Sequence, residues 1–316
     1  MNARFDSNTL IRRSALSVPA DKEKFIEKAW TRNADVITLD LEDGVSADRK
    51  AAAREALAYA VPAVGKGGSA VAVRVNNEPD LLWDDLEAAV RPGVNAVALP
   101  KMEDPEQLIR IEKEIGRLEA ERGMAPGSVA TTIAIETAFG FLHMEELARA
   151  TVRGISLGLG VEDFTREIGM EVVTGDEILF ARQQMVVVAC AYGLQAKGLI
   201  GRMTDYRDLE GMFQVALRSN RYGLRGTTCI HPNQVEICNR AFRPQPEAVE
   251  KARRVVEAMA EAEARGSGTT SLDGRMIDKP VAERYGRILA RHQAAEDYEA
   301  HKRACRAAAG FEEDPA

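Results

Sequence analysis

The sequence predicts an α/β protein in which a (β/α)8 TIM barrel is followed by a C-terminal helical lid segment. Short apolar or β-branched runs alternate with longer helical patterns, which is typical of βα units around a parallel sheet. Eight such units fit within about 240 residues, the usual size of this barrel. Charged residues also follow the apolar runs repeatedly, where a barrel carries its active-site loops. Alternation alone does not establish closure, so a doubly wound sheet is the competing architecture.

Eight strands are expected, one for each short apolar run. They cover residues 14–18, 36–41, 70–75, 96–99, 129–136, 155–159, 194–196 and 227–230. The seventh is the least regular, because LQAKGLIG is short and rich in glycine. Helices are expected over residues 21–32, 47–61, 80–90, 104–122, 140–150, 176–192, 205–221 and 233–242.

Two regions are therefore expected: a catalytic barrel over residues 1–245 and a C-terminal region over 246–316. The second region begins with a helix over about 246–265, rich in Ala, Glu and Arg. The segment GSGTTSLDG then predicts a flexible hinge, after which a helical pattern resumes from RMIDKP. This region is interpreted as a mobile lid over the barrel mouth or, equally well on pattern alone, as a loosely packed tail.

The composition limits the function classes. Hydrophobic residues make up 45% and charged residues 29%, as in globular enzymes, and the net charge of -7 argues against nucleic acid or an anionic membrane as partner. No run approaches the roughly 18 apolar residues of a spanning helix, and the first residues do not resemble a signal peptide. The four cysteines lack metal-ligand spacing and are expected to be reduced thiols in a cytoplasmic protein.

Charged residues follow most of the predicted strands at their carboxyl ends. The segments concerned are DLEDGV at 40–45, RVNN at 74–77, PK at 100–101, ET at 136–137, GLGVED at 158–163 and IHP at 230–232. A buried charge is costly unless it is paired or bound to a metal, so packing alone does not explain the repetition. These strand ends are the predicted active site.

Glu136 and Asp163 are the candidate metal ligands, because both follow apolar runs on strands expected to be neighbours. Two carboxylates without His or Cys suit a hard cation whose remaining ligands are water and substrate oxygens. The alternative is that Asp163 caps the following helix and Glu136 pairs with a nearby Lys or Arg. Pattern alone leaves these interpretations about equal.

Arg74 could bind a substrate carboxylate through two parallel hydrogen bonds from its guanidinium, or it could form a structural ion pair with Glu42 or Asp43. Lys101 could form a Schiff base, although a solvated lysine or a partner for Glu103 is favoured. His231 is interpreted as structural. The GLGVED segment lacks the third glycine of a dinucleotide fingerprint and the lysine of a P-loop, so both are rejected.

At these residues the chain resembles the HpcH/HpaI aldolase and citrate lyase β-subunit family, in its CitE-like, malyl-CoA lyase-like branch. The matching segments follow in order along nearly the whole chain. They are RRSALSVPA at 12–20, DVITLDLEDGV at 35–45, VRVNN at 73–77, LPKME at 99–103, IAIETAFG at 133–140, LGLGVEDFTREIG at 157–169, IHPNQV at 230–235 and GRMIDKP at 274–280.

The resemblance implies a homotrimeric or homohexameric barrel with Mg2+ at its mouth, Mn2+ being possible as a substitute. It implies that Glu136 and Asp163 bind the metal and that Arg74 binds the carboxylate of the oxo acid. Glu42 and Asp43 would hold the metal-bound waters and the Arg74 guanidinium in place. It also implies that Asp278, in a lid exchanged between subunits, acts in the neighbouring site. The coenzyme A phosphates would meet Arg13 and Lys22 or Lys28.

Two departures from the family pattern stand near the mouth. Members often carry Ile-Asp-Gly after the seventh strand's LQA, whereas this chain continues LQAKGLIGRMTDYRD, which is longer and lacks that aspartate. Ser17 stands where an aromatic residue is frequent. These differences put the contacts on that side of the mouth and the pocket floor in doubt, but not the metal pair.

The function implied is a Mg2+-dependent carbon–carbon lyase that cleaves or forms a 3-hydroxy-acyl-CoA such as malyl-CoA or citramalyl-CoA. Its products would be acetyl-CoA and a small 2-oxo acid, either glyoxylate or pyruvate. The alternatives are a citrate lyase β-subunit acting on a carrier-protein or CoA thioester, a malyl-CoA thioesterase, a CoA-free class II aldolase, and a non-catalytic scaffold. The MID tail argues against the aldolase, and retention of the carboxylates, Arg74 and Asp278 argues against the scaffold.

Overall fold

The computed structural model describes residues 6–171, 173–201 and 206–311. Its first compact unit contains Arg12–Phe242 together with the segment that starts at Lys302, and its second contains Asn8–Ile11 and Arg243–His301. The predicted boundary at residue 245 lies three residues beyond Phe242, but the end of the chain returns to the first unit. None of the described helices is both long and apolar enough to cross a membrane.

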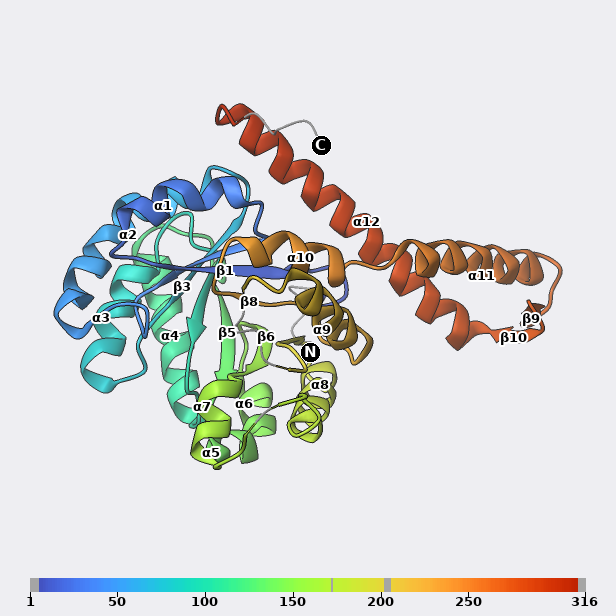
Figure 1. The fold of residues 1–316 in the computed structure, drawn as a ribbon, viewed down its shortest axis with the longest axis horizontal. Coiled ribbons are helices and arrows are strands. Elements are labelled where there is room, and N and C mark those ends of the chain that lie inside the picture. Colours follow the sequence, from blue (N-terminus) through green and yellow to red (C-terminus); the bar gives the residue numbers. More distant parts are fainter. Residues whose placement is uncertain (1–5, 172, 202–205, 312–316) are drawn as a thin grey trace. The chain divides into compact units, whose positions relative to one another are not determined.

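The first unit is an eight-stranded parallel sheet surrounded by helices (Figure 1). Its strands are β1 (Ser14–Pro19), β2 (Val36–Asp40), β3 (Ala70–Arg74), β4 (Ala96–Leu99), β5 (Ala130–Ile135), β6 (Gly154–Leu159), β7 (Gln195–Lys197) and β8 (Thr227–Cys229). They are arranged in the order β7-β6-β5-β4-β3-β2-β1-β8. A doubly wound sheet would reverse its strand order partway, so sequential order supports the barrel.

Two backbone hydrogen bonds bring the edge strands β7 and β8 together. The Gly198 N–H donates to the Gly226 carbonyl at 2.8 Å, and the Arg225 N–H donates to the Ala196 carbonyl at 2.9 Å. The eight strands therefore form a nearly closed barrel, which confirms the predicted fold class.

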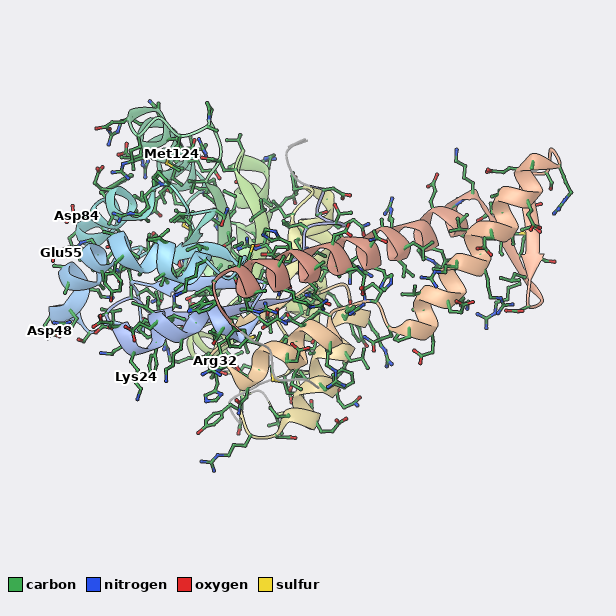
Figure 2. The ribbon with its side chains drawn as sticks, turned by 90° about the horizontal axis from the view of Figure 1, so that it is seen from above. Lys24, Arg32, Asp48, Glu55, Asp84 and Met124 are labelled. Carbon is green, nitrogen blue, oxygen red and sulfur yellow. The ribbon has the colours of Figure 1, made fainter. Side chains whose placement is uncertain are left out.

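Helices follow the strands and cover the outside of the barrel. They are α1 (Glu23–Ala29), α2 (Lys50–Gly65), α3 (Pro79–Ala89), α4 (Pro105–Glu121), α5 (Ala138–Leu142), α6 (Met144–Ala150), α7 (Val161–Glu167), α8 (Leu179–Ala191), α9 (Leu209–Arg221) and α10 (Asn233–Ala241), with 3-10 turns at Trp30–Arg32 and Ala47–Arg49. Charged side chains on their outer faces point to solvent, as Lys24, Glu55 and Asp84 do in Figure 2. Helix α7 was not expected from the sequence.

Helix α4 illustrates how the sequence specifies these elements. The Asp104 side chain accepts a hydrogen bond from the Glu106 N–H, and proline occupies the first helical position, which fixes where the helix begins. Leu108, Ile111 and Ile115 are fully buried and recur at helical spacing. Burial of each such side chain contributes roughly 1.5–3 kcal/mol, so the apolar stripe holds the helix against the sheet.

The second unit contains helix α11 (Pro246–Ala264), a hairpin of β9 (Thr269–Leu272) and β10 (Arg275–Asp278), and most of α12 (Lys279–Ala308). Within it, Val255, Met259 and Ile277 form a small apolar core. The predicted irregular hinge is instead this antiparallel hairpin. Asp273 and Gly274 have φ values of 51° and 73°, the positive values that a two-residue hairpin turn requires.

The last turns of α12 belong to the first unit. Lys302 is fully buried, and its ammonium lies 2.8 Å from Asp35 Oδ1. Asp35 also receives the guanidinium of Arg13, with Nε 2.8 Å from Oδ2. Burial acts to raise the pKa of Asp35, but the two cations outweigh it and hold that pKa well below its usual value. This cluster lies at the start of β2, away from the carboxyl ends of the strands.

Candidate active site and metal centre

Arg74 lies at the end of β3, directly beside the last residue of β2. Asp40 and Arg74 are register partners, and the guanidinium binds the carboxylate with Nε 2.7 Å from Oδ1 and Nη2 2.6 Å from Oδ2. Partial burial acts to lower the pKa of Arg74, but the hydrogen bonds and charge of Asp40 raise it overall. Arg74 is therefore a fixed cation. Its main partner is Asp40, which was not expected from the sequence, whereas the expected ion pair with Glu42 is present at 2.9 Å.

Asp40 also organises the loop that follows β2. Its Oδ1 accepts from the Glu42 N–H at 2.9 Å, and its Oδ2 accepts from the Gly44 N–H at 3.0 Å. A Cβ atom at Gly44 would lie 2.4 Å from Asp40 Oδ2, so this close approach requires glycine. The signal for Asp40 in the sequence is its place as the last residue of a strand, four residues before that glycine.

Glu42 is buried and joins two cations. Its Oε2 lies 2.9 Å from Arg74 Nη1 and its Oε1 lies 2.5 Å from Lys101 Nζ. Partial burial lowers the pKa of Lys101, but its hydrogen bond to Glu42 raises it overall. Lys101 is thus held protonated, which argues against a Schiff base. The expected pairing of Lys101 with Glu103 is wrong, because Glu103 instead accepts a hydrogen bond from the Thr137 hydroxyl.

Asp43 differs from Glu42 in its environment. Its side chain is 63% exposed, and its carboxylate lies 3.7 Å from the Lys101 ammonium. Its carboxylate makes no hydrogen bond or ion pair with Arg74 among the described residues, although its charge helps to raise the pKa of Arg74. Of the two predicted acids, Glu42 is therefore the buried ion-pair partner and Asp43 an exposed charge at the rim of the site. Asp43 remains a predicted site residue through its charge rather than through a direct bond.

Glu136 is a nearly buried carboxylate that receives no hydrogen bond or ion pair from the described residues. Burial, followed by the charges of Glu42 and Asp163, raises the pKa of Glu136 to about 7. A Cβ atom at Gly160 would lie 2.7 Å from Glu136 Cγ, so glycine makes room for the acid. An unpaired carboxylate in this setting costs free energy unless it is protonated or binds a cation.

Asp163 lies in the first turn of α7 and interacts electrostatically with Glu136. It is not the helix cap, a position held by Gly160, and its Oδ1 lies 2.6 Å from the largely exposed Arg166. The structure therefore supports neither half of the alternative in which Asp163 caps the helix and Glu136 pairs with a base.

The two carboxylates fit a hard divalent cation. Their oxygen donors are those that Mg2+ prefers, and Mg2+ commonly keeps several waters beside one or two carboxylates. Among the described residues, no group of three or more His, Cys, Asp or Glu side chains is arranged to hold a metal.

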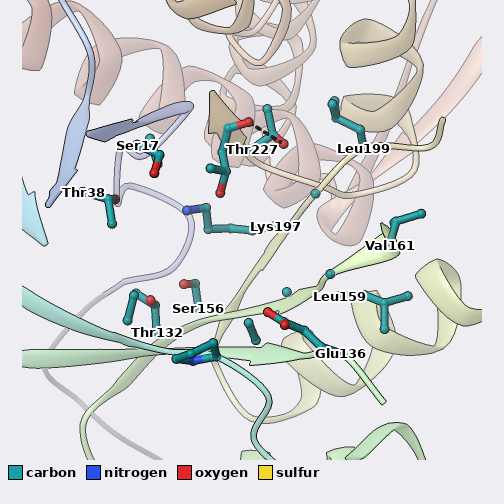
Figure 3. A pocket seen from close by; sticks show the side chains of 18 of the residues that line it. Ser17, Thr38, Thr132, Glu136, Ser156, Leu159, Val161, Lys197, Leu199 and Thr227 are labelled. Atoms are coloured by element: carbon teal, nitrogen blue, oxygen red, sulfur yellow. Dashed lines mark hydrogen bonds between the residues drawn. The ribbon is translucent and has the colours of Figure 1, made fainter. Parts of the chain in front are cut away.

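A cavity of about 440 Å3 joins these groups to the barrel interior. Glu136, Asp163 and Arg74 line its outer part, at the carboxyl ends of the strands. Deeper in the barrel it is lined by the small or polar residues Ser17, Thr38, Thr132 and Ser156, and by Lys197. Figure 3 shows these side chains around a common space, with Glu136 on one side and the Lys197 amine pointing into the middle.

Three basic residues were predicted to meet coenzyme A phosphates. Arg13 is 2% exposed and its guanidinium is bound to Asp35 at the amino end of the barrel, so its environment does not suit phosphate binding. Lys22 lies between β1 and α1, immediately before the first residue of α1, and its side chain is 53% exposed. Lys28 is exposed in the last turn of α1. Lys22 and Lys28 remain predictions.

Asp278 ends β10 in the second unit, and its Oδ1 accepts a hydrogen bond from the Val281 N–H at 3.0 Å. This bond caps the start of α12. A capping role is a structural reason for an acid here, and it can be separated from catalysis because asparagine caps equally well. The catalytic role of Asp278 remains a prediction.

Comparisons with known proteins agree with this site. The family model described as HpcH/HpaI aldolase/citrate lyase matches residues 13–232. The chain is 36% identical to the citrate lyase subunit beta of Escherichia coli K12 over 286 residues, covering 90% of this chain and 94% of that protein. It is 33% identical to the human mitochondrial citramalyl-CoA lyase over 288 residues, covering 85% and 82%.

A solved structure also matches. The CitE protein of Mycobacterium tuberculosis, in complex with magnesium, acetoacetate and coenzyme A, has a TM-score of 0.71 and 29% sequence identity, covering 90% of this chain and 99% of that one. Sequence relatives named as lyases and a matching barrel lead to one assignment. The chain belongs to the HpcH/HpaI aldolase/citrate lyase family and is a carbon–carbon lyase.

Proposed function

We propose that this chain is a Mg2+-dependent lyase that splits a 3-hydroxy-acyl-CoA, such as malyl-CoA or citramalyl-CoA, into acetyl-CoA and a 2-oxo acid. The observation that carries the proposal is the unpartnered carboxylate of Glu136 beside Asp163, in the cavity that Arg74 also lines. The relatives named as citramalyl-CoA lyase and CitE support the thioester and the metal. Mn2+ is proposed as a substitute metal.

Glu136 and Asp163 would hold the Mg2+ ion. When bound, Mg2+ would supply Lewis-acid chemistry that makes the substrate hydroxyl more acidic. Arg74 would bind the carboxylate on the hydroxyl-bearing carbon and stabilise the negative charge that develops on the hydroxyl oxygen. Because Asp40 and Glu42 fix the guanidinium beforehand, little reorganisation would be needed during the reaction.

Transfer of the hydroxyl proton to water would let the adjacent carbon–carbon bond break, which would release the 2-oxo acid and leave a thioester enolate. Asp278 of a neighbouring subunit would protonate the enolate carbon, or take a methyl proton in the condensing direction. This step requires a homo-oligomer, with a trimer or hexamer proposed from the family. Lys22 and Lys28 are the proposed contacts of the coenzyme A phosphates.

The test is to incubate the purified chain and Mg2+ separately with malyl-CoA, citramalyl-CoA and citryl-CoA, following 2-oxo acid, acetyl-CoA and free thiol. Acetyl-CoA with an equal amount of 2-oxo acid, abolished by a chelator and in Asp163→Ala, would establish the lyase. Free thiol without acetyl-CoA would show a thioesterase instead. No reaction with any of the three would redirect the proposal to a carrier-protein thioester.

A further inference from the structure

The seventh strand places a lysine inside the barrel. Lys197 is the register partner of Gly158 on β6, and Gly158 is the partner of Ala134 on β5. All three line the cavity, so they belong to one inward-facing row. Because its two row neighbours have small side chains or none, the lysine has open space beside it. Barrel interiors are usually filled by bulky branched residues, and this one is not.

Lys197 has no hydrogen bond or ion pair with any described residue. The ionisable groups that act on its amine are Arg12, whose charge lowers the pKa, and the Cys229 thiol, which raises it slightly. Burial is the largest cause, and together these effects lower the pKa of Lys197 to about 7. An amine in this state gains a full positive charge when an anion binds beside it.

Acidic side chains line only the outer part of the cavity, where Arg74 also lies. These acids are Glu136, Glu162 and Asp163, which follow the carboxyl ends of β5 and β6. Lys197 lies deeper, among the hydroxyl groups of Ser17, Thr38, Thr132 and Ser156 (Figure 3). Arg12, which precedes β1, also lines the cavity. The deep part therefore combines positive charge with hydroxyl donors, which is the chemistry that binds a carboxylate.

The row of Lys197 lies one inward-facing layer below the metal ligands. On β5, Glu136 is the next inward position after Ala134, and successive inward positions are about 6–7 Å apart along a strand. A small acid held at Glu136 and Asp163 by its oxo end would therefore have its far end close to the lysine.

We propose that Lys197 binds the second carboxylate of a dicarboxylic 2-oxo acid whose other end lies at the Glu136–Asp163 site. This inference rests on the proposed function and makes it more specific, because it favours a dicarboxylic oxo acid over glyoxylate or pyruvate. It also gives a role to the LQAKGLIG segment, where the chain departs from its family.

The experiment measures binding of oxaloacetate and pyruvate by calorimetry in saturating Mg2+ at pH 7.5, in two buffers of different ionisation enthalpy. The proteins are wild type, Lys197→Met, Lys197→Gln and the matched control Leu199→Val, which alters an apolar part of the same cavity lining but keeps the cation and the hydroxyl donors. Removing an unpaired interior charge leaves no new charge unsatisfied, so both lysine variants are expected to fold.

Wild type is expected to bind oxaloacetate about 10- to 100-fold more tightly than pyruvate, the usual range for a hydrogen bond to a charged group. It should also take up protons with oxaloacetate but not with pyruvate. Both lysine variants should lose the preference and the proton uptake while still binding pyruvate, and Leu199→Val should keep the preference and the proton uptake.

An unchanged preference in the lysine variants, or no preference in wild type, would overturn the role of Lys197 and leave the proposed function standing. Failure of wild type to bind either acid would overturn both. Covalent trapping of pyruvate on Lys197 by borohydride would also overturn the proposal, because it would assign the amine to Schiff-base chemistry.

Discussion

Magnesium affinity is expected to depend on pH through Glu136. The pKa of this carboxyl is raised to about 7 by burial and by the charges of Glu42 and Asp163. A metal binds the deprotonated acid, so protonation competes with Mg2+ as the pH falls. For a pKa near 7, the apparent Kd grows by a factor of 1 + 10^(7 − pH), which is roughly 2-fold at pH 7 and about 11-fold at pH 6.

The assay is calorimetric titration of the metal-free protein with Mg2+ between pH 5.5 and 8.5. Apparent Kd should be constant above pH 8 and then rise tenfold per pH unit below about pH 6.5. Asp163→Asn should bind Mg2+ weakly and keep a pH dependence through Glu136, with its midpoint moved to lower pH because the Asp163 charge no longer raises the pKa of Glu136. A constant Kd down to pH 5.5, or a midpoint near the ordinary glutamate pKa, would refute the environment described for Glu136.

Three further outcomes are expected. Without metal, the protonated form of Glu136 favours the folded state fully below pH 4.5, and this contribution is lost as the pH rises through about 7. At pH 8 the free energy of unfolding of Glu136→Gln, measured by denaturant titration, should therefore exceed that of wild type by up to roughly 3 kcal/mol. Gly160→Ala should weaken Mg2+ binding with little change in circular dichroism, because its Cβ would displace Glu136; unchanged affinity would contradict that packing. Asp278→Asn should lower turnover by about 10^2- to 10^4-fold at an unchanged melting temperature, whereas Asp278→Ala should lower both turnover and melting temperature. Near-wild-type turnover in Asp278→Asn would show that Asp278 only caps the helix.

The barrel was predictable because its information is local and repeated. Each apolar run before a charged strand end marks one βα unit, and the three-residue β7 lies within one residue of its expected place despite its glycines. Helix α7 was missed because it is a single short run directly after a glycine-rich loop. The hairpin of the second unit was missed because its strands are polar, although the Asp273–Gly274 turn was a usable signal.

The site was predictable as a set of strand ends but not as a set of bonds. The acid that lies beside Arg74 is determined by the register between β2 and β3, which places Asp40 opposite Arg74. Arg13 precedes its strand and is therefore at the opposite end of the barrel from the mouth, which a motif match along the sequence does not reveal. Lys197 was overlooked because a lysine is usually assigned to the surface, and only barrel closure turns this one inward.

The return of α12 to the first unit has a consequence for protein engineering. Residues 243–301 are an insertion in the barrel unit, since the chain belongs to that unit both before residue 243 and again from Lys302. Lys302 supplies one of the two cations that neutralise the buried Asp35. A stop codon after α11 would remove that cation and leave the buried aspartate only partly compensated, at a cost of about 3–5 kcal/mol. Loss of activity in such a truncation would thus combine damage to the barrel with the loss of Asp278. A shortened protein that preserves the barrel must keep the segment that begins at Lys302.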